Sequence, residues 1–389
     1  MKVCIITLIG YNNYGNRLQH FALNSLLREE GLEVESWSKL YVREELLNRG
    51  SKNARVYLAK RILPLPMYAA LERIQEYGSL WKQRHNDTII IKKEKALKNF
   101  TLKYIGELTT IYENSYINLQ RRIEERKIDF FITGSDQVWN PKWDRKGYFF
   151  LNFAHPNQRL SFAASFGVSQ IPAEDKMRFR DLLRSMAFIS VREERGVDIV
   201  KELSGREAEL TMDPTLLLGK EGWDHYVDEA RVEIPKHYIA TYFLGETPKA
   251  VYEFASEKGL PLVQMNNKKE EYYFALDPLQ FLYVIRQADY MLTDSFHGTV
   301  FSILFEKQFY VFERVGLKQD MFSRIQSLVD TFGLQSRIQS NDKIIEVGDI
   351  NRDQWSEMKR IIVQSRIMSM TKLMSAMGIE RVENCNGCN

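Results

Sequence analysis

Short runs of apolar residues alternate along the chain with longer segments in which apolar residues recur every three or four positions. The first pattern is typical of buried parallel strands, and the second is typical of helices that pack through one face. Predicted strands cover residues 2–9, 33–37, 128–133, 160–164, 187–191, 238–243, 261–265, 290–293 and 308–312. Predicted helices cover residues 16–30, 173–185, 192–203, 248–258, 278–287, 320–332 and 352–377. This alternation predicts an α/β fold built from parallel sheets.

The length of the chain predicts more than one domain. A chain of 389 residues is longer than a single hydrophobic core usually supports, so we expect two doubly wound domains. We assign residues 1–188 to the first domain and 189–350 to the second, although no Gly-, Pro- or Ser-rich linker marks the boundary. Residues 351–389 form a Met-rich helix and a tail, and we expect the helix to pack back across both domains.

One segment, residues 52–103, interrupts the alternation of strands and helices. It holds 12 Lys and Arg against 4 Asp and Glu, with aromatic and aliphatic residues interleaved. A basic amphipathic insertion of this kind can lie on an anionic membrane surface. It can equally form a helical hairpin whose apolar stripe packs on the domain, because basic outer faces are common on soluble helices. The sequence leaves both alternatives open.

Composition and charge narrow the class of protein. With 44% hydrophobic and 27% charged residues, the chain is expected to be globular and cytoplasmic, and its three Cys fit a reducing compartment. The net charge of +3 gives no reason to expect nucleic acid as a partner. No apolar run is long enough to span a membrane, and the first is too short for a signal peptide. Neither the six His nor the Cys385 and Cys388 pair has a complete set of metal-ligand spacings, so we expect no metal and no cofactor.

The most informative segment is residues 289–299, where a strand is followed by a polar turn and a helix. Ser295 follows the strand, the turn carries His297 and Gly298, and Thr299 opens the next apolar run. Open α/β sheets bind ligands at the carboxyl ends of their strands, and a helix amino terminus favours anions. His297 is therefore a candidate general acid/base beside an anion site. The alternative is a helix-capping turn with an ordinary surface His.

Two loops in the first half carry further candidates. The first lies between the first strand and helix and offers Gly15, Asn16 and Arg17, with free backbone N–H groups at the helix start. The second follows strand 128–133 and offers Ser135, Asp136, Gln137, Trp139 and Asn140. Asp136 is a candidate base or hydroxyl ligand, and the Trp139 ring is a candidate platform for a sugar. The structural alternatives are an ordinary turn for the first loop, and an Asp cap followed by a buried Trp for the second.

Two more strand ends hold charged residues. Arg192 follows strand 187–191, where a guanidinium suits bidentate capture of a carboxylate or phosphate. It could instead pair with the neighbouring acids. Asp213 precedes Pro214 in an extended turn, where we expect it only to fix the loop.

Taken together, these motifs resemble the polysaccharide pyruvyl transferase family over about residues 3–335. The resemblance rests on the segments 13–19, 134–141, 190–193, 213–215, 293–299 and 322–325. It implies a GT-B-like fold, in which two Rossmann-like domains with doubly wound parallel sheets enclose a cleft. It also implies an enzyme that uses phosphoenolpyruvate to install a pyruvate ketal on a sugar, with the acceptor on the first domain and phosphoenolpyruvate on the second.

The resemblance also implies roles for individual residues. His297 matches the family's catalytic His, Arg192 an Arg that binds phosphoenolpyruvate, and Asp136 an acidic residue of the first domain. The chain departs from the family at Ser295, where many members have Arg. Arg324, Arg17 or the N–H groups at the start of the helix near Gly298 are the candidates to replace it.

The functional hypothesis is transfer of pyruvate to two hydroxyls of a hexose in a surface or exopolysaccharide repeat unit, with release of phosphate. The acceptor is expected to be a glycan, plausibly lipid-linked, which would give residues 52–103 a peripheral role at the inner face of the membrane. Two alternatives stay open. One is a GT-B glycosyltransferase that uses a nucleotide sugar, and the other is a non-catalytic member that binds glycan.

Overall fold

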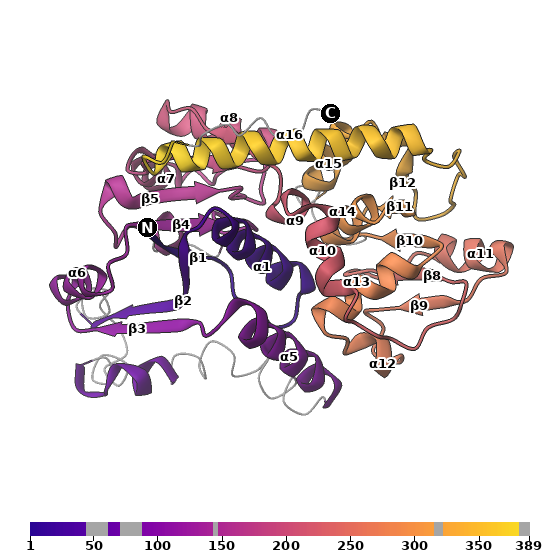
Figure 1. Cartoon of the computed structure of the whole chain (residues 1–389), viewed down its shortest axis with the longest axis horizontal. Helices are drawn as coiled ribbons and strands as arrows, with labels where there is room; N and C mark the ends of the chain where they lie inside the picture. The colour runs from indigo at the N-terminus through magenta and orange to yellow at the C-terminus, as the bar shows by residue number, and fades with distance from the viewer. Residues whose placement is uncertain (44–60, 71–87, 143–146, 315–321, 381–389) are drawn as a thin grey trace.

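The computed structural model describes residues 1–43, 61–70, 88–142, 147–314 and 322–380. Its two halves lie side by side, and each has a parallel sheet surrounded by helices (Figure 1). The sheet of the first half has the strand order β3-β2-β1-β4-β5. These strands are β1 (Lys2–Ile6), β2 (Glu33–Val42), β3 (Thr109–Glu113), β4 (Phe130–Gly134) and β5 (Arg159–Phe162). All the pairings are parallel, as the near-continuous apolar runs predict.

The sheet of the second half has the order β12-β11-β10-β8-β9 and is also parallel throughout. Its strands are β8 (Ile239–Tyr242), β9 (Leu262–Gln264), β10 (Tyr290–Thr293), β11 (Gln308–Phe312) and β12 (Ile338–Gln339). Both strand orders are doubly wound, so each sheet has one point where the chain direction across the sheet reverses. The two sheets confirm the predicted α/β, GT-B-like architecture.

Each reversal point lies next to strands whose following loops face the other half. In the first sheet the reversal is between β1 and β4, and in the second it is between β8 and β10. Ligands of open α/β sheets bind at such points, outside the carboxyl ends of the strands. The topology alone therefore directs attention to the loops that follow β1, β4, β8 and β10.

Helices cover the sheets. The first half contains α1 (Tyr14–Glu29), α6 (Tyr116–Glu125), α7 (Lys176–Arg184) and α8 (Glu194–Ser204). The second contains α11 (Lys249–Lys258), α12 (Glu271–Phe274), α13 (Pro278–Gln287), α14 (Phe296–Leu304) and α15 (Ser323–Thr331). Between the halves the chain forms α9 (Pro214–Leu217) and α10 (Gly219–Val227). Helix α1 is buried along most of its length, and its apolar face belongs to a core that continues into the second half.

Residues just after the predicted domain boundary pack with the first half. The short strands β6 (Ser190–Val191) and β7 (Glu209–Leu210) pair with each other, and a bridge joins Ala164 to Val191. Ile199 and Val200 of α8 share a core cluster with β1 and β4. The division at residue 188 stays a prediction, and the pairing of the strands favours a boundary after residue 210.

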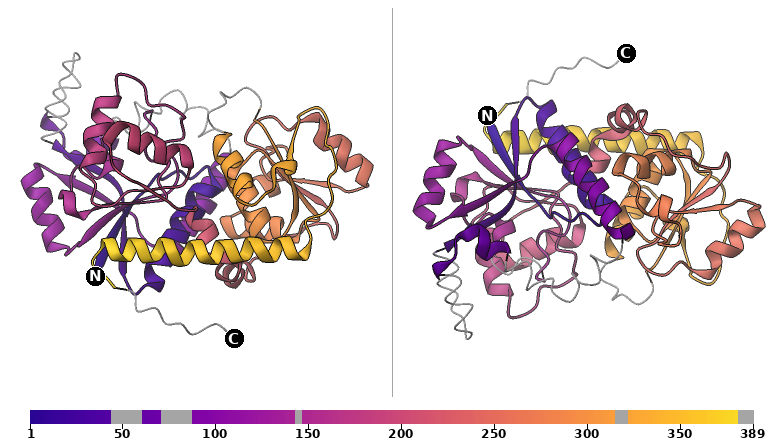
Figure 2. Two further views of the ribbon diagram at one scale, coloured as in Figure 1. Left: turned by 90° about the horizontal axis from the view of Figure 1, so that it is seen from above. Right: turned by 90° about the horizontal axis from the view of Figure 1, so that it is seen from below.

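The last helix, α16 (Arg352–Ala376), lies along both halves, as predicted (Figure 2). It buries Met358, Met370, Leu373 and Met374. Its basic side chains form ion pairs on both sides, from Arg366 to Glu29 and Lys372 to Glu209 in the first half, and from Lys359 to Glu221 next to α10. The Met-rich pattern therefore reflects a helix that closes the two halves together.

Within the basic segment 52–103, the structure describes residues 61–70 and 88–103, and the remainder lies outside the described residues. Within them, α5 (Thr88–Phe100) packs through Ile89, Lys93, Leu97 and Phe100, and a π-helical turn, Thr101–Ile105, follows it. This part agrees with the packed alternative. Contact with a membrane stays a prediction. No helix among the described residues has the length and apolar character needed to cross a bilayer.

Candidate active site

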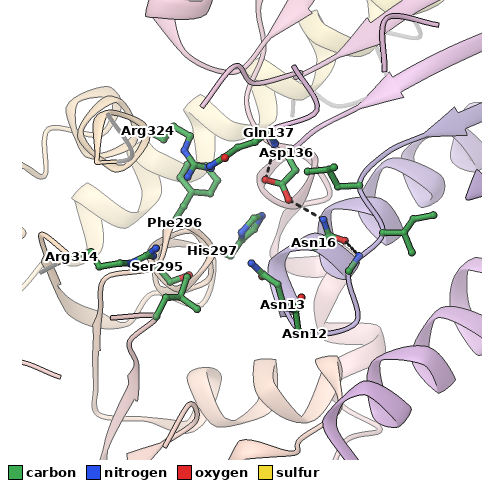
Figure 3. A pocket seen from close by; sticks show the side chains of 14 residues that line it. Asn12, Asn13, Asn16, Asp136, Gln137, Ser295, Phe296, His297, Arg314 and Arg324 are labelled. Atoms are coloured by element: carbon green, nitrogen blue, oxygen red, sulfur yellow. Dashed lines mark hydrogen bonds between the residues drawn. The ribbon is translucent and has the colours of Figure 1, made fainter. Parts of the chain in front are cut away.

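A cavity of about 450 Å³ lies between the two halves, at the carboxyl ends of the strands flanking both reversal points. Figure 3 shows its side chains converging from both halves, with His297 near the middle. The first half contributes Leu8, Ile9, Gly10, Asn12, Asn13, Asn16, Asp136 and Gln137. The second half contributes Leu244, Ser295, Phe296, His297, Arg314 and Arg324. The walls thus differ in chemistry, because the first is rich in amides and the second carries the cations.

His297 lies in the first turn of α14, directly after β10. Ser295 caps this helix, and its hydroxyl accepts from the N–H of Gly298 at 3.4 Å. Gly298 is needed for close packing, because a Cβ there would lie 2.5 Å from Thr293 Oγ1. Thr299 is fully buried and donates to the carbonyl of Ser295 at 3.1 Å, so it stabilises the turn and does not line the cavity.

The imidazole of His297 packs directly on Gly15, in the first turn of α1. A Cβ built on Gly15 would lie 2.0 Å from Nδ1 of His297, far inside any normal contact. Only glycine therefore lets the start of α1 approach the ring this closely. The Gly15 motif and the His297 motif, which are remote in sequence, meet across the two halves at this point.

Asp136 faces His297 from the loop after β4 (Figure 3). Its backbone is left-handed, with φ at 66°, a conformation that Asp tolerates better than most residues. Asn16 donates to its carboxylate at 3.1 Å, and the N–H of Gln137 donates at 2.9 Å. Burial would raise the pKa of Asp136, but Arg192 and His297 hold it below its ordinary value. The group is therefore a carboxylate at neutral pH and can accept a proton or a hydroxyl hydrogen bond.

Beneath the cavity, Arg192 is held between carboxylates. Its Nη1 donates to Asp213 Oδ2 at 2.6 Å, and its Nη2 lies 3.5 Å from Asp136 Oδ1. Only 1% of its side chain is exposed, and it is absent from the cavity wall. The structure therefore brings Arg192 to the site but places it behind Asp136, where it orders the carboxylates.

Asp213 is the centre of this buried network. It accepts from Ser135 Oγ at 2.9 Å, and from the N–H and hydroxyl of Thr215 at 3.0 and 2.7 Å. Its Oδ2 lies 3.8 Å from Nε2 of His297. Burial would raise the pKa of Asp213, but His297 and Arg192 keep it low, so the carboxylate stays charged. It fixes the loop, as expected, and it also faces the imidazole.

The surroundings of His297 lower its pKa. Burial is the largest cause, and it outweighs the opposing effect of the carboxylates of Asp213 and Asp136. Within the described part of the chain, Nε2 of His297 has no hydrogen-bond partner. The ring is therefore neutral at pH 7 and has a nitrogen that can accept a proton.

Two arginines flank His297 on the side of the second half (Figure 3). Arg324 from α15 faces Gln137, whose side-chain oxygen in its favourable orientation accepts from Nη1 at 3.2 Å and Nη2 at 2.6 Å. Burial lowers the pKa of Arg324 to about 10, so it stays charged. The centroid of the Phe296 ring lies 5.9 Å from Arg324 Cζ and 4.8 Å from Arg192 Cζ, so the ring contacts both guanidinium groups.

Arg314 reaches the cavity from the chain after β11. Its Nε donates to Asp294 Oδ2 at 2.9 Å. The same carboxylate accepts from the N–H groups of Leu244 and Gly245 at 2.6 and 2.8 Å, which ties the loops after β8 and β10 together. Sequence reasoning missed Arg314. Its only signal was its place two residues after a predicted strand, since no motif surrounds it.

Arg17 and Trp139, which were predicted to bind substrate, lie away from the cavity wall. Arg17 is fully buried and donates to the carbonyl of Leu8 at 2.6 Å, so it supports the loop after β1. Trp139 is also fully buried, and its ring stacks on Phe150 with centroids 4.7 Å apart. That ring face is covered, which corrects the expectation that it stacks on a sugar and corresponds to the buried-Trp alternative.

The remaining predicted residues support the loops from within. Ser135 is fully buried and bonded to Asp213. Asn140 is buried and accepts from the N–H of Lys142 at 3.0 Å. Of the predicted replacements for an Arg at position 295, Arg324 therefore lines the cavity and Arg17 does not.

Solved structures similar to this chain include two 2-epimerases and a glycosyltransferase. The UDP-GlcNAc 2-epimerase of Neisseria meningitidis is 11% identical, covers 100% of this chain and 96% of its own, and has a TM-score of 0.43. A putative UDP-N-acetylglucosamine 2-epimerase of Listeria monocytogenes is 9% identical, with coverages of 98% and 99% and a TM-score of 0.48. A spinosyn rhamnosyltransferase is 13% identical, with coverages of 97% and 96% and a TM-score of 0.42.

Sequence comparison is more specific. A search among curated proteins finds no match. The sequence model of the family described as polysaccharide pyruvyl transferase matches residues 13–314, which run from the loop before α1 to Arg314 and include every cavity residue except Leu8, Ile9, Gly10, Asn12 and Arg324. The chain belongs to the polysaccharide pyruvyl transferase family.

Proposed function

We propose that this protein transfers pyruvate from phosphoenolpyruvate to two hydroxyls of a hexose in a surface or exopolysaccharide repeat unit, forming a ketal and releasing phosphate. The observation that carries the proposal is the position of His297, in a cavity with cations on one wall and amides and a carboxylate on the other. A donor with two anionic groups and an acceptor with several hydroxyls need walls of these two kinds.

The wall of the second half suits the donor. Arg314 and Arg324 lie on that wall with His297, and α14 begins at the cavity with its N–H groups. Guanidinium groups and a helix amino terminus both stabilise phosphate and carboxylate. We assign the anionic groups of phosphoenolpyruvate to this wall.

The wall of the first half suits a sugar. Asn12, Asn13, Asn16 and Asp136 offer amide donors and acceptors and one carboxylate, which together can bind vicinal hydroxyls. This division agrees with the expectation that the acceptor occupies the first half and the donor the second.

The reaction needs a group that donates a proton and later accepts one. Protonation of C3 of phosphoenolpyruvate leaves an oxocarbenium centre at C2, which the first hydroxyl attacks. The bond between C2 and the phosphate oxygen then breaks, phosphate leaves with the electron pair, and the second hydroxyl attacks C2. One hydroxyl proton restores the acid, and the other leaves with phosphate, so the protons balance.

His297 is our candidate for that group. Burial lowers its pKa and so favours the neutral ring, whereas an incoming donor with a carboxylate and a phosphate would favour its protonated form. Binding of phosphoenolpyruvate would thus favour protonation of His297, the acid that then protonates C3. Asp136, a carboxylate facing the same ring, is placed to receive the proton of an acceptor hydroxyl.

Arg192 takes a different role in this proposal from the one that the family resemblance implied. Because its guanidinium is buried between Asp213 and Asp136, we assign it to positioning those carboxylates, while Arg314 and Arg324 contact the donor. Sequence reasoning could not make this distinction, since all three arginines follow strands or open helices.

The test is release of phosphate from phosphoenolpyruvate by the native protein and by His297→Ala, with galactosyl, mannosyl and N-acetylhexosaminyl acceptors. Release that depends on the acceptor, and that falls by about 10² to 10⁴ in the variant, would support the proposal. Nucleotide sugars offered to the same acceptors form the second arm. Sugar transfer in that arm without phosphate release in the first would contradict the proposal.

A further inference from the structure

Lys93 of α5 is buried at the seam between the two halves, with only 4% of its surface exposed. Among the described residues it has no carboxylate partner, and its ammonium donates to Asn266 Oδ1 at 3.3 Å. Its ammonium lies 4.5 Å from the ring centroids of Tyr14 and Phe274, and 5.8 Å from that of Tyr242. Burial lowers its pKa to about 8, so most of it carries a charge at pH 7. A buried charge with only ring faces and one amide oxygen around it is costly, and its presence here calls for a reason.

The aromatic box around Lys93, formed by Tyr14, Tyr242 and Phe274, draws on both halves. Lys93 and Tyr14 come from α5 and α1 of the first half, whereas Tyr242 ends β8 and Phe274 ends α12 of the second. Asn266 donates from Nδ2 to the carbonyl of Phe243 at 2.8 Å, which keeps its amide oxygen turned toward Lys93. The ammonium therefore attracts groups on both sides of the seam at once.

Tyr14 inserts into the second half at the same place. Its hydroxyl donates to the carbonyl of Leu276 at 3.0 Å and to that of Phe274 at 3.2 Å. Its ring stacks on Phe281, with centroids 4.3 Å apart and planes at 11°. Tyr14 is also the first residue of α1, and the next residue is Gly15, which packs on His297.

These contacts form a short rigid path from the seam to the cavity. Consecutive residues of a helix have a fixed relative geometry, so the position of Tyr14 determines the positions of Gly15 and Asn16. Gly15 contacts the ring of His297, and Asn16 donates to Asp136. Lys93 itself is absent from the cavity wall and would act only through Tyr14.

We propose that Lys93 is a positioning residue: its ammonium holds Tyr14 against Tyr242 and Phe274 of the second half and so keeps the start of α1 seated against His297. The inference deepens the proposed function and depends on it for the readout of turnover. It concerns the geometry of the same site, so a readout that needs no substrate can test it separately.

The experiment compares Lys93→Met with Lys92→Met in the full chain. Met has a chain of similar length to Lys but no charge. Lys92 is the neighbouring residue of α5 with 61% of its side chain exposed, and its pair with Glu271, 69% exposed and 3.9 Å away, is expected to contribute little. The first readout is the NMR signal of His297 in protein with labelled histidine, assigned by its loss in His297→Asn. The second is the turnover number for phosphate release with phosphoenolpyruvate, together with the KM for the donor.

The inference predicts that Lys93→Met shifts the His297 signal and lowers the turnover number by at least about tenfold, while thermal unfolding shows a folded protein. Lys92→Met should leave both as in the native protein, and Lys93→Arg should restore part of the turnover because a guanidinium also binds ring faces. If the native protein releases no phosphate, the proposed function fails, and the His297 signal alone decides this inference.

A native signal and native turnover in Lys93→Met would overturn the inference. An equal change in Lys92→Met would overturn it as well, because the effect would then belong to α5 in general. Should Lys93→Met fail to fold, Phe274→Leu removes one ring face and keeps the lysine. It is then expected to shift the His297 signal in the same direction, and an unshifted signal would refute the proposal.

Discussion

The contact between Gly15 and His297 allows a test in which one methyl group perturbs the site. In Gly15→Ala the new Cβ would lie 2.0 Å from Nδ1 of His297, whereas non-bonded heavy atoms prefer about 3.5 Å. The imidazole and the start of α1 must therefore separate by roughly 1.5 Å. Neither can relax freely, because α1 is buried along most of its length and His297 is enclosed between the two halves.

A displacement of that size is large on the scale of catalysis. A misplacement of about 1 Å can cost about 10²-fold in rate, so we expect Gly15→Ala to lower the turnover number by about 100-fold or more. The fold should survive, because Ala is the better helix former by about 1 kcal/mol, which offsets part of the strain. The assay is phosphate release from phosphoenolpyruvate, with the unfolding midpoint measured in parallel.

The matched control is Gly348→Ala, since a Cβ at Gly348 meets nothing within 4 Å. It should leave turnover and stability close to native. Turnover of Gly15→Ala within a few-fold of native would refute the reasoning, because the ring would then tolerate displacement and could not be the group that carries the proton.

Three further predictions concern charge in the site. Asp213→Asn removes the carboxylate nearest Arg192 and leaves a buried cation poorly paired, so the free energy of unfolding, measured with denaturant, should fall by about 3 kcal/mol. The control Glu207→Gln, in an exposed pair with Lys201, should cost less than about 1 kcal/mol, and equal losses would contradict a stabilising role for the buried Asp213–Arg192 pair. The pKa of His297, measured by NMR, should lie below 6.5 in the free protein because burial disfavours the protonated ring. It should rise when phosphoenolpyruvate binds because the anionic groups favour the protonated ring, and a fall on binding would exclude anions next to His297. Arg314→Gln should raise the KM for phosphoenolpyruvate by roughly 10- to 100-fold, as expected for loss of a charged hydrogen bond. The control Arg360→Gln, on the exposed face of α16, should leave the KM unchanged, and an unchanged KM in Arg314→Gln would remove Arg314 from the donor site.

Much of the fold follows from the periodicity of apolar residues. The strands β10 and β11 occupy the predicted residues, because each is a buried apolar run between clear polar ends. By contrast, β3 (Thr109–Glu113) and α6 (Tyr116–Glu125) were not predicted. β3 forms an edge of its sheet and is only partly buried, so its sequence lacks the continuous apolar run that marks a central strand.

The site was only partly predictable, and the reason lies in its loops. His297, Asp136 and Asn16 meet at the cavity as their strand-end positions suggested, and Arg324, which only the family resemblance indicated, meets them there. Loop residues have no periodicity that distinguishes an inward from an outward side chain. For this reason the inward Trp139 was assigned to binding, as was Arg17, which was expected at the edge of a loop but lies in the first turn of α1, while Arg314, which reaches the cavity, was missed. Such distinctions depend on tertiary packing and cannot be made from local pattern.

The most direct test of the account follows the carbon that becomes the ketal centre. Phosphoenolpyruvate labelled isotopically at C2 is incubated with the native protein and the acceptor that supports phosphate release, and the product is analysed by NMR. The account predicts a labelled quaternary carbon bonded to two oxygens of the same sugar, absent with His297→Ala. Label recovered only as free pyruvate, or as unchanged phosphoenolpyruvate with every acceptor, would contradict it.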